Sequence, residues 1–124
     1  MELNAYFKSI LEQDREHVVI CDLNHTILYM NPSAIRDYAK YGGASLLGRS
    51  LMRCHNPQSV VVIQKAVDWF AADKGHNLIF THYDEKHDRD VYMVALRDDA
   101  GDLIGYYEKH ESRKRETMKP YDME

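Results

Sequence analysis

The sequence has few cysteines and no long apolar run. Cys21 and Cys54 are its two cysteines, too few for the disulfide framework of a small secreted protein. No stretch approaches the ~20 apolar residues that a membrane-spanning helix needs. The first residues lack the basic start and the apolar stretch of a secretion signal. We therefore expect a soluble, cytoplasmic protein with reduced thiols and no membrane partner.

Motifs for enzyme chemistry are also missing. There is no Gly-rich phosphate loop, no Ser-x-x-Lys or nucleophile elbow, and no carboxylate pair on one element, so we expect no catalytic residues and no enzyme activity. The 16 basic and 20 acidic residues give a net charge of −4, which argues against direct nucleic-acid binding. Seven histidines are present, yet Cys21-x-x-x-His25 has no second half-site, so we expect no metal site.

Length and patterning indicate one domain with a short extension at each end. A chain of 124 residues fits a single domain and buries roughly two-thirds of its surface on folding, so it can hold a core and a small cavity. We place an amphipathic cap helix at residues 1–16, the domain at 17–110 and a charged tail at 111–124. The stripe of the cap helix either covers an edge of the domain or pairs with a second copy, and it consists of Leu3, Tyr6, Phe7, Ile10 and Leu11.

Two helix starts share one signal, an asparagine followed by a proline. Asparagine accepts backbone N–H bonds as a cap, and proline suits the first helical position. Asn31-Pro32 follows a hairpin predicted from the β-branched runs 18–22 and 26–30. Asn56-Pro57 opens the strongest helix of the chain, at 58–73. The apolar residues of this helix occupy so much of its circumference that we expect other elements to cover it on more than one side.

Three further strands are indicated near the C-terminus, at 77–83, 91–96 and 103–110. The order is then two strands, several helical pieces and three strands, with a hairpin at each end. Such an order favours antiparallel pairing with the helices segregated to one face. We therefore predict an α+β fold in which a five-stranded antiparallel sheet carries helices on one face, including one long connecting helix.

Three short motifs resemble those of the PAS sensor family, in the same order. The segment from Asp22 to Asn31 is similar to the first hairpin of the family, and Leu47-Gly48-Arg49 is similar to its Ile/Leu-Gly-Lys/Arg element. The segment Arg97-Asp-Asp-Ala-Gly-Asp-Leu-Ile-Gly105 is similar to its Arg-Asp-x-x-Gly-x-x-x-Gly hairpin. The resemblance spans residues 17–110. It implies a bacterial PAS domain of the stand-alone type, because no kinase, cyclase or helix-turn-helix pattern follows.

The segment Arg53-Cys-His-Asn-Pro-Gln-Ser-Val60 resembles a Cys-His-x-Pro element of some PAS domains from anaerobic bacteria. A helix N-terminus favours the thiolate of Cys54, and His55 could bond a ligand or bind haem iron. The alternative is that Cys54 packs as a small hydrophobe and His55 bonds a backbone carbonyl. The resemblance implies a ligand between sheet and helices, bordered by Leu28, Met30, Cys54, His55, Ile63, Phe80 and His82.

Two functions remain open at this point. The first is a small-molecule- or cofactor-sensing module in signal transduction or transcription regulation, acting through a separate output partner or a rearranged homodimer. The ligand of such a module would be either haem or a small apolar molecule. Flavin is not expected, because the Asn-Cys-Arg-Phe-Leu-Gln element of the light-oxygen-voltage branch is absent. The second function is a ligand-free dimerisation domain, which a filled core would favour.

Overall fold

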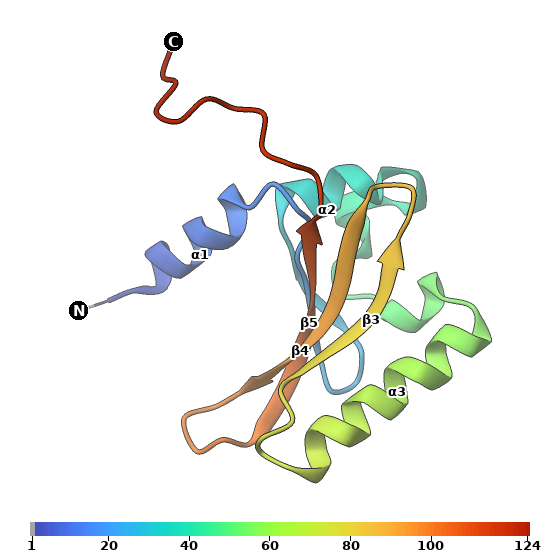
Figure 1. Cartoon of the computed structure of the whole chain (residues 1–124). Coiled ribbons are helices and arrows are strands. Elements are labelled where there is room, and N and C mark those ends of the chain that lie inside the picture. Colours follow the sequence, from blue (N-terminus) through green and yellow to red (C-terminus); the bar gives the residue numbers. More distant parts are fainter. Residues whose placement is uncertain (1) are drawn as a thin grey trace.

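The centre of the fold is a five-stranded antiparallel sheet with the strand order β2-β1-β5-β4-β3 (Figure 1). The computed structural model describes residues 2–124, apart from the side chain of Cys54. The sheet confirms the predicted fold class. Its strands are β1 (Val19–Asp22), β2 (Ile27–Met30), β3 (Leu78–Asp84), β4 (Arg89–Arg97) and β5 (Leu103–Ser112).

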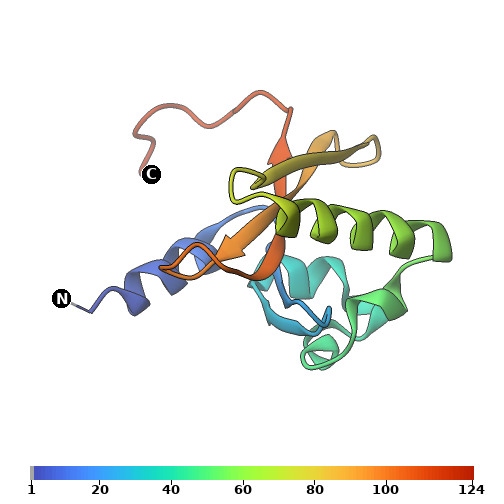
Figure 2. The ribbon, with the colours of Figure 1, turned by 90° about the horizontal axis from the view of Figure 1, so that it is seen from below.

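The helices, apart from the first, lie on one side of this sheet (Figure 2). The long helix connects the two halves of the sheet, as predicted, and three 3-10 turns precede it. The first helix extends away from the rest of the domain in both views (Figures 1 and 2). In chain order, the helical elements are α1 (Asn4–Gln13), α2 (Pro32–Asp37), η1 (Ala39–Tyr41), η2 (Gly43–Leu46), η3 (Leu51–Cys54) and α3 (Pro57–Ala72).

Both predicted asparagine caps are present, and Asn31 does more than cap α2. Its side-chain oxygen accepts hydrogen bonds from the backbone N–H groups of Ala34 and Val18, at 3.0 and 2.9 Å. Its side-chain nitrogen donates to the carbonyls of Leu11 and Glu16, both at 3.0 Å. Because Asn31 is fully buried, these four bonds satisfy its amide and join the end of α1 to β1 and α2.

Helix α3 packs through one face rather than two. Ala66, Val67 and Phe70 are buried against the sheet, whereas Val61 and Trp69 are 53% and 39% exposed. The expectation that α3 is covered on more than one side is therefore wrong for the chain as described. The physical reason is that the domain has two layers, so the outer face of α3 has no third layer against it.

The arginine of the Arg-Asp hairpin motif fixes the C-terminal end of α3. The Arg97 guanidinium donates to the carbonyls of Phe70, Asp73 and His76, at 2.7, 3.2 and 3.1 Å. It also donates to the Gly101 carbonyl in the turn between β4 and β5. One side chain thus satisfies carbonyls at the end of the helix, which otherwise lack partners, and ties them to the sheet.

Helix α1 exposes its apolar stripe. Tyr6, Phe7 and Ile10 are 65%, 56% and 67% exposed. The helix is held at its C-terminal end, where the Tyr29 hydroxyl donates to Glu12 at 2.9 Å. The stripe therefore does not cover an edge of its own domain. Among the residues that the structure describes, no helix combines the length and apolarity needed to cross a membrane.

The last residue of the Arg-Asp hairpin motif, Gly105, allows β1 and β5 to pair closely. Gly105 lies opposite Asp22, and a Cβ atom added to Gly105 would lie 2.2 Å from the Cys21 carbonyl oxygen. That contact is with backbone, which cannot rotate aside. Any other residue at this position would push the two central strands apart.

We expect Gly105→Ala to lower the free energy of unfolding by about 3 kcal/mol, because the added methyl group overpacks the β1–β5 contact. Chemical denaturation followed by circular dichroism measures this loss. Gly75→Ala is the matched control, since its Cβ would meet only the flexible side chain of Asp73. Equal stability of the two variants would contradict the assigned role of Gly105.

Candidate functional site

A cavity of about 410 Å³ lies between the first turns of α3 and the inner face of the sheet. The helix contributes Ile63 and Val62, and the strands contribute Val91 and Met93, so most of its wall is apolar. Polar groups gather at one side, where His55, His82 and Glu108 line it. The remaining lining residues are Asn56, Gln58, Ser59 and Thr81.

His55 stands where three cavities meet. Besides the first cavity, it lines an apolar one of about 170 Å³ under η2 and a polar one of about 580 Å³ near α2. Its Nδ1 lies 2.9 Å from the Leu51 carbonyl, which can only accept, so Nδ1 carries the proton. The other ring nitrogen, Nε2, is then left as an acceptor or a metal ligand.

Two histidines and a glutamate meet at the end of the β1–β5 ladder. Val19 pairs with Glu108, and His110 lies two residues further along β5, so Glu108 and His110 share the inner face. His17 lies two residues before β1 and contacts His110. The Nε2 atoms of His17 and His110 are in direct contact. Burial lowers the pKa of His17 to about 4 and that of His110 to about 3, and it raises the pKa of Glu108.

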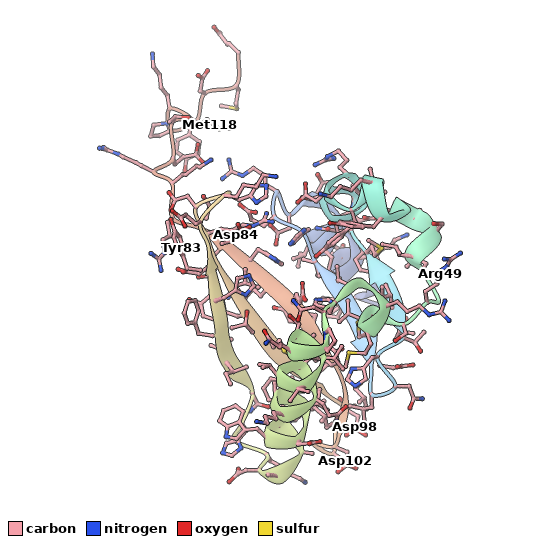
Figure 3. The ribbon with its side chains drawn as sticks, turned by 90° about the vertical axis from the view of Figure 1, so that its right-hand side faces the viewer. Arg49, Tyr83, Asp84, Asp98, Asp102 and Met118 are labelled. Carbon is pink, nitrogen blue, oxygen red and sulfur yellow. The ribbon has the colours of Figure 1, made fainter. Side chains whose placement is uncertain are left out.

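Arg89 lies at the edge of this cluster, and nearby carboxylates compensate its positive charge. Its guanidinium lies 3.0 Å from Glu16, 3.0 Å from Asp84 and 3.7 Å from Asp37. One of its nitrogens also lies 3.5 Å from Nε2 of His17. Asp84 is labelled in Figure 3, at the opposite end of the sheet from Asp98 and Asp102. The cluster and its carboxylates therefore belong to the end of the domain away from the β4–β5 turn.

Several solved structures have the same arrangement of elements. The C-terminal domain of a Streptococcus mutans protein superposes with a TM-score of 0.68 at 20% identity, over 87% of this chain and 83% of that one. A PAS domain from Colwellia psychrerythraea superposes with a TM-score of 0.66 at 13% identity, over 90% and 97%. This chain has the PAS fold. No protein-family model matches the sequence, and no curated protein matches it.

One structural neighbour is a haem-binding sensor. The Aer2 receptor from Vibrio cholerae, a dual PAS-heme oxygen sensor, superposes with a TM-score of 0.56 at 14% identity. The match covers 79% of this chain and 94% of that one. Similarity at this level establishes the shared fold.

The PAS structure brings four of the seven predicted site residues to the cavities. His55, Ile63 and His82 line the first cavity, and Met30 lines the apolar one beneath η2. Ligand binding by these four remains a prediction. Cys54 has the predicted place just before α3, but its side chain lies outside the described residues.

Leu28 and Phe80 require correction, because their side chains are 58% and 52% exposed and line none of the three cavities described above. Both lie beside β-bulges. Ile20 pairs with Tyr29 and Cys21 with Ile27, so Leu28 is the inserted residue of β2. In β3, Phe80 pairs with Tyr92 and His82 with Val91, so the extra Thr81 places Phe80 and His82 on opposite faces.

His17, Glu108 and His110 were not predicted as site residues from the sequence. They are up to 93 positions apart, and no short motif contains all three. A signal was nevertheless present: His17-x-Val19 and Glu108-x-His110 have the two-residue period of strands. Once β1 and β5 are paired antiparallel, that period places the three side chains together.

A second polar network links α3 to the sheet beneath it. His25 Nδ1 lies 2.8 Å from the Tyr106 hydroxyl, and His25 Nε2 lies 2.8 Å from the side-chain oxygen of Gln64 on α3. Cys21 is buried beside Tyr106, and burial raises the pKa of its thiol to about 12. Cys21 is thus part of the core, and Cys21-x-x-x-His25 forms a structural network around Tyr106.

In a Cys54→Ser variant, we expect iodoacetamide to alkylate Cys21 at least ~100-fold more slowly in the folded protein than in denaturant. The thiolate is the reactive form, and burial both blocks access and raises the thiol pKa. Mass spectrometry of timed samples at pH 8 measures the two rates. Labelling of the folded variant as fast as that of the unfolded chain would contradict the placement of Cys21.

Proposed function

We propose that this PAS domain senses a small molecule or cofactor in the cytoplasm and acts in signal transduction or transcription regulation, without catalysing a reaction. The observation that carries the proposal is the cavity between α3 and the sheet, with its apolar wall and its polar group of His55, His82 and Glu108. Its volume of about 410 Å³ is within the range of small-molecule sites.

The lining indicates the chemistry of the ligand. Val62, Ile63, Val91 and Met93 suit an apolar body, and the polar group at one side suits a hydrogen-bonding head. An apolar molecule with one polar end is therefore the first ligand class. Haem is the second, because Nε2 of His55 is left without the ring proton and the Aer2 receptor is a PAS-heme sensor.

The signal would pass through α3. A ligand in the cavity contacts the first turns of this helix as far as Ile63. The next residue, Gln64, bonds His25, which bonds Tyr106 in β5. A ligand that binds better to one position of α3 than to another shifts the population toward that position. The output would reach a separate partner protein or a second copy of the chain.

A ligand-free dimerisation domain is the second candidate function, and α1 favours it. The exposed stripe of Tyr6, Phe7 and Ile10 has no cover in the part of the chain that the structure describes. Pairing with the same helix of a second copy would bury it. None of the residues that line the cavity belongs to α1, so dimerisation through α1 would also be compatible with the sensor function.

To test the ligand site, we expect Ile63→Trp to abolish ligand binding, because the indole would occupy the cavity. Native mass spectrometry of the protein, as purified and after addition of haemin, measures the bound mass. Val61→Trp is the matched control, since Val61 lies on the same helix and is exposed. Wild-type protein that takes up neither a cellular compound nor haemin would overturn the sensor proposal, and so would equal binding by both variants.

To test dimerisation, we expect Phe7→Glu combined with Ile10→Glu to convert a dimer to a monomer, because two charges would replace the apolar contact. Light scattering coupled to size-exclusion chromatography measures the mass. Ser9→Glu places a charge on the same exposed helix outside the stripe and should leave the dimer intact. A wild-type monomer at high protein concentration would contradict the second candidate.

A further inference from the structure

The three polar side chains at the end of the β1–β5 ladder are arranged as metal ligands are. One ring nitrogen of His17, one of His110 and one carboxylate oxygen of Glu108 all lie within 4.8 Å of one another. Both histidines are buried, and Glu108 is half-buried. Three ligand atoms from three different residues therefore point at one small volume inside the domain.

The hydrogen bonds of the two histidines leave the facing nitrogens without protons. His110 Nδ1 lies 3.1 Å from the His17 carbonyl, which only accepts, so Nδ1 carries the His110 proton and Nε2 is bare. Nε2 of His17 faces a guanidinium nitrogen of Arg89 at 3.5 Å, which only donates. The His17 proton then lies on Nδ1, which has Asp37 Oδ2 at 3.1 Å.

Two bare imidazole nitrogens in contact cannot hydrogen-bond to each other, since neither has a proton to donate. The buried Nδ1 of His17 also makes no hydrogen bond among the described residues, because the approach of Asp37 has ion-pair distance but not hydrogen-bond geometry. An ion that accepts both lone pairs would remove the conflict between the facing nitrogens. Outer groups that hold the opposite nitrogen, as the His17 carbonyl does for His110, are typical of metal-binding histidines.

The charges around the cluster favour a cation. Arg89 supplies one positive charge, but the carboxylates of Glu16, Asp84 and Asp37 lie within 3.7 Å of its guanidinium. These three negative charges outweigh the single positive one. The Glu108 carboxylate would add a fourth negative charge as a direct ligand.

We propose that His17, Glu108 and His110 bind one divalent first-row transition-metal ion. Two imidazole nitrogens and one carboxylate oxygen suit Zn²⁺, Fe²⁺, Co²⁺ or Ni²⁺ rather than Ca²⁺ or Mg²⁺. Three protein ligands leave at least one further position, and the polar cavity of about 580 Å³ that all three residues line gives access to it. Glu108 also lines the cavity of the organic ligand proposed above, so the two sites share this carboxylate. Ile63 belongs to neither the cluster nor the polar cavity, so Ile63→Trp tests the organic ligand alone.

The test uses the full chain, freed of metal with a chelator and titrated with Co²⁺ alone. We expect one Co²⁺ per chain, with the visible absorption of a four- or five-coordinate ion and displacement by Zn²⁺. Glu108→Gln keeps the shape of the side chain but removes its charge, and it should weaken Co²⁺ binding by more than about tenfold. His110→Gln should do the same.

His87→Asn is the matched control. His87 lines the same cavity and pairs with Asp84 at 2.8 Å, but it does not belong to the cluster. This variant should bind Co²⁺ as the wild type does. The melting temperature of each variant without metal shows whether it folds, and Zn²⁺ should raise that temperature in the wild type and His87→Asn but not in Glu108→Gln. The proposal is overturned if the wild type binds no Co²⁺, if Glu108→Gln binds it equally well, or if His87→Asn loses it.

Discussion

The antiparallel pairing of β1 with β5 is the constraint on which the rest of the domain depends. It joins strands from opposite ends of the chain at the centre of the sheet, and the helical segment between β2 and β3 covers one face (Figure 2). It requires Gly105, because no side chain fits against the Cys21 carbonyl. The same register sets His17 opposite His110, so the backbone contact that completes the fold also assembles the most polar part of its interior.

Local signals made most of the architecture readable from the sequence. The Asn-Pro pairs marked the starts of α2 and α3 because their chemistry acts within one helical turn. The turn residues around Asp22 and Asp98 marked the β1–β2 and β4–β5 hairpins in the same way. Arg97 and Gly105 belonged to a recognisable motif, although their roles as a helix clamp and a close strand contact appear only in three dimensions.

The site was less predictable, because its geometry depends on irregularities and on distant pairing. Assigning strand faces by strict alternation fails where one residue is inserted, and Leu28 and Phe80 both lie beside such bulges. The contact between His17 and His110 depends on which strands pair, and the pairing of strands depends on the fold of the whole chain. Helix α1 shows a further limit. Its apolar stripe was predictable from the sequence, but the surface that packs against the stripe was not.

The Arg97 guanidinium makes the two ends of α3 mechanically unequal, because it bonds Phe70 and Asp73 at the C-terminal end of the helix and also the loop and turn beside it. The C-terminal end is fastened to the sheet and acts as a pivot, whereas the N-terminal end spans the hollow beside His55. A helix of 16 residues is about 24 Å long, so it works as a lever arm. With its C-terminal end held, a small tilt of this helix would displace its N-terminal end, at Pro57, more than any other part of the helix.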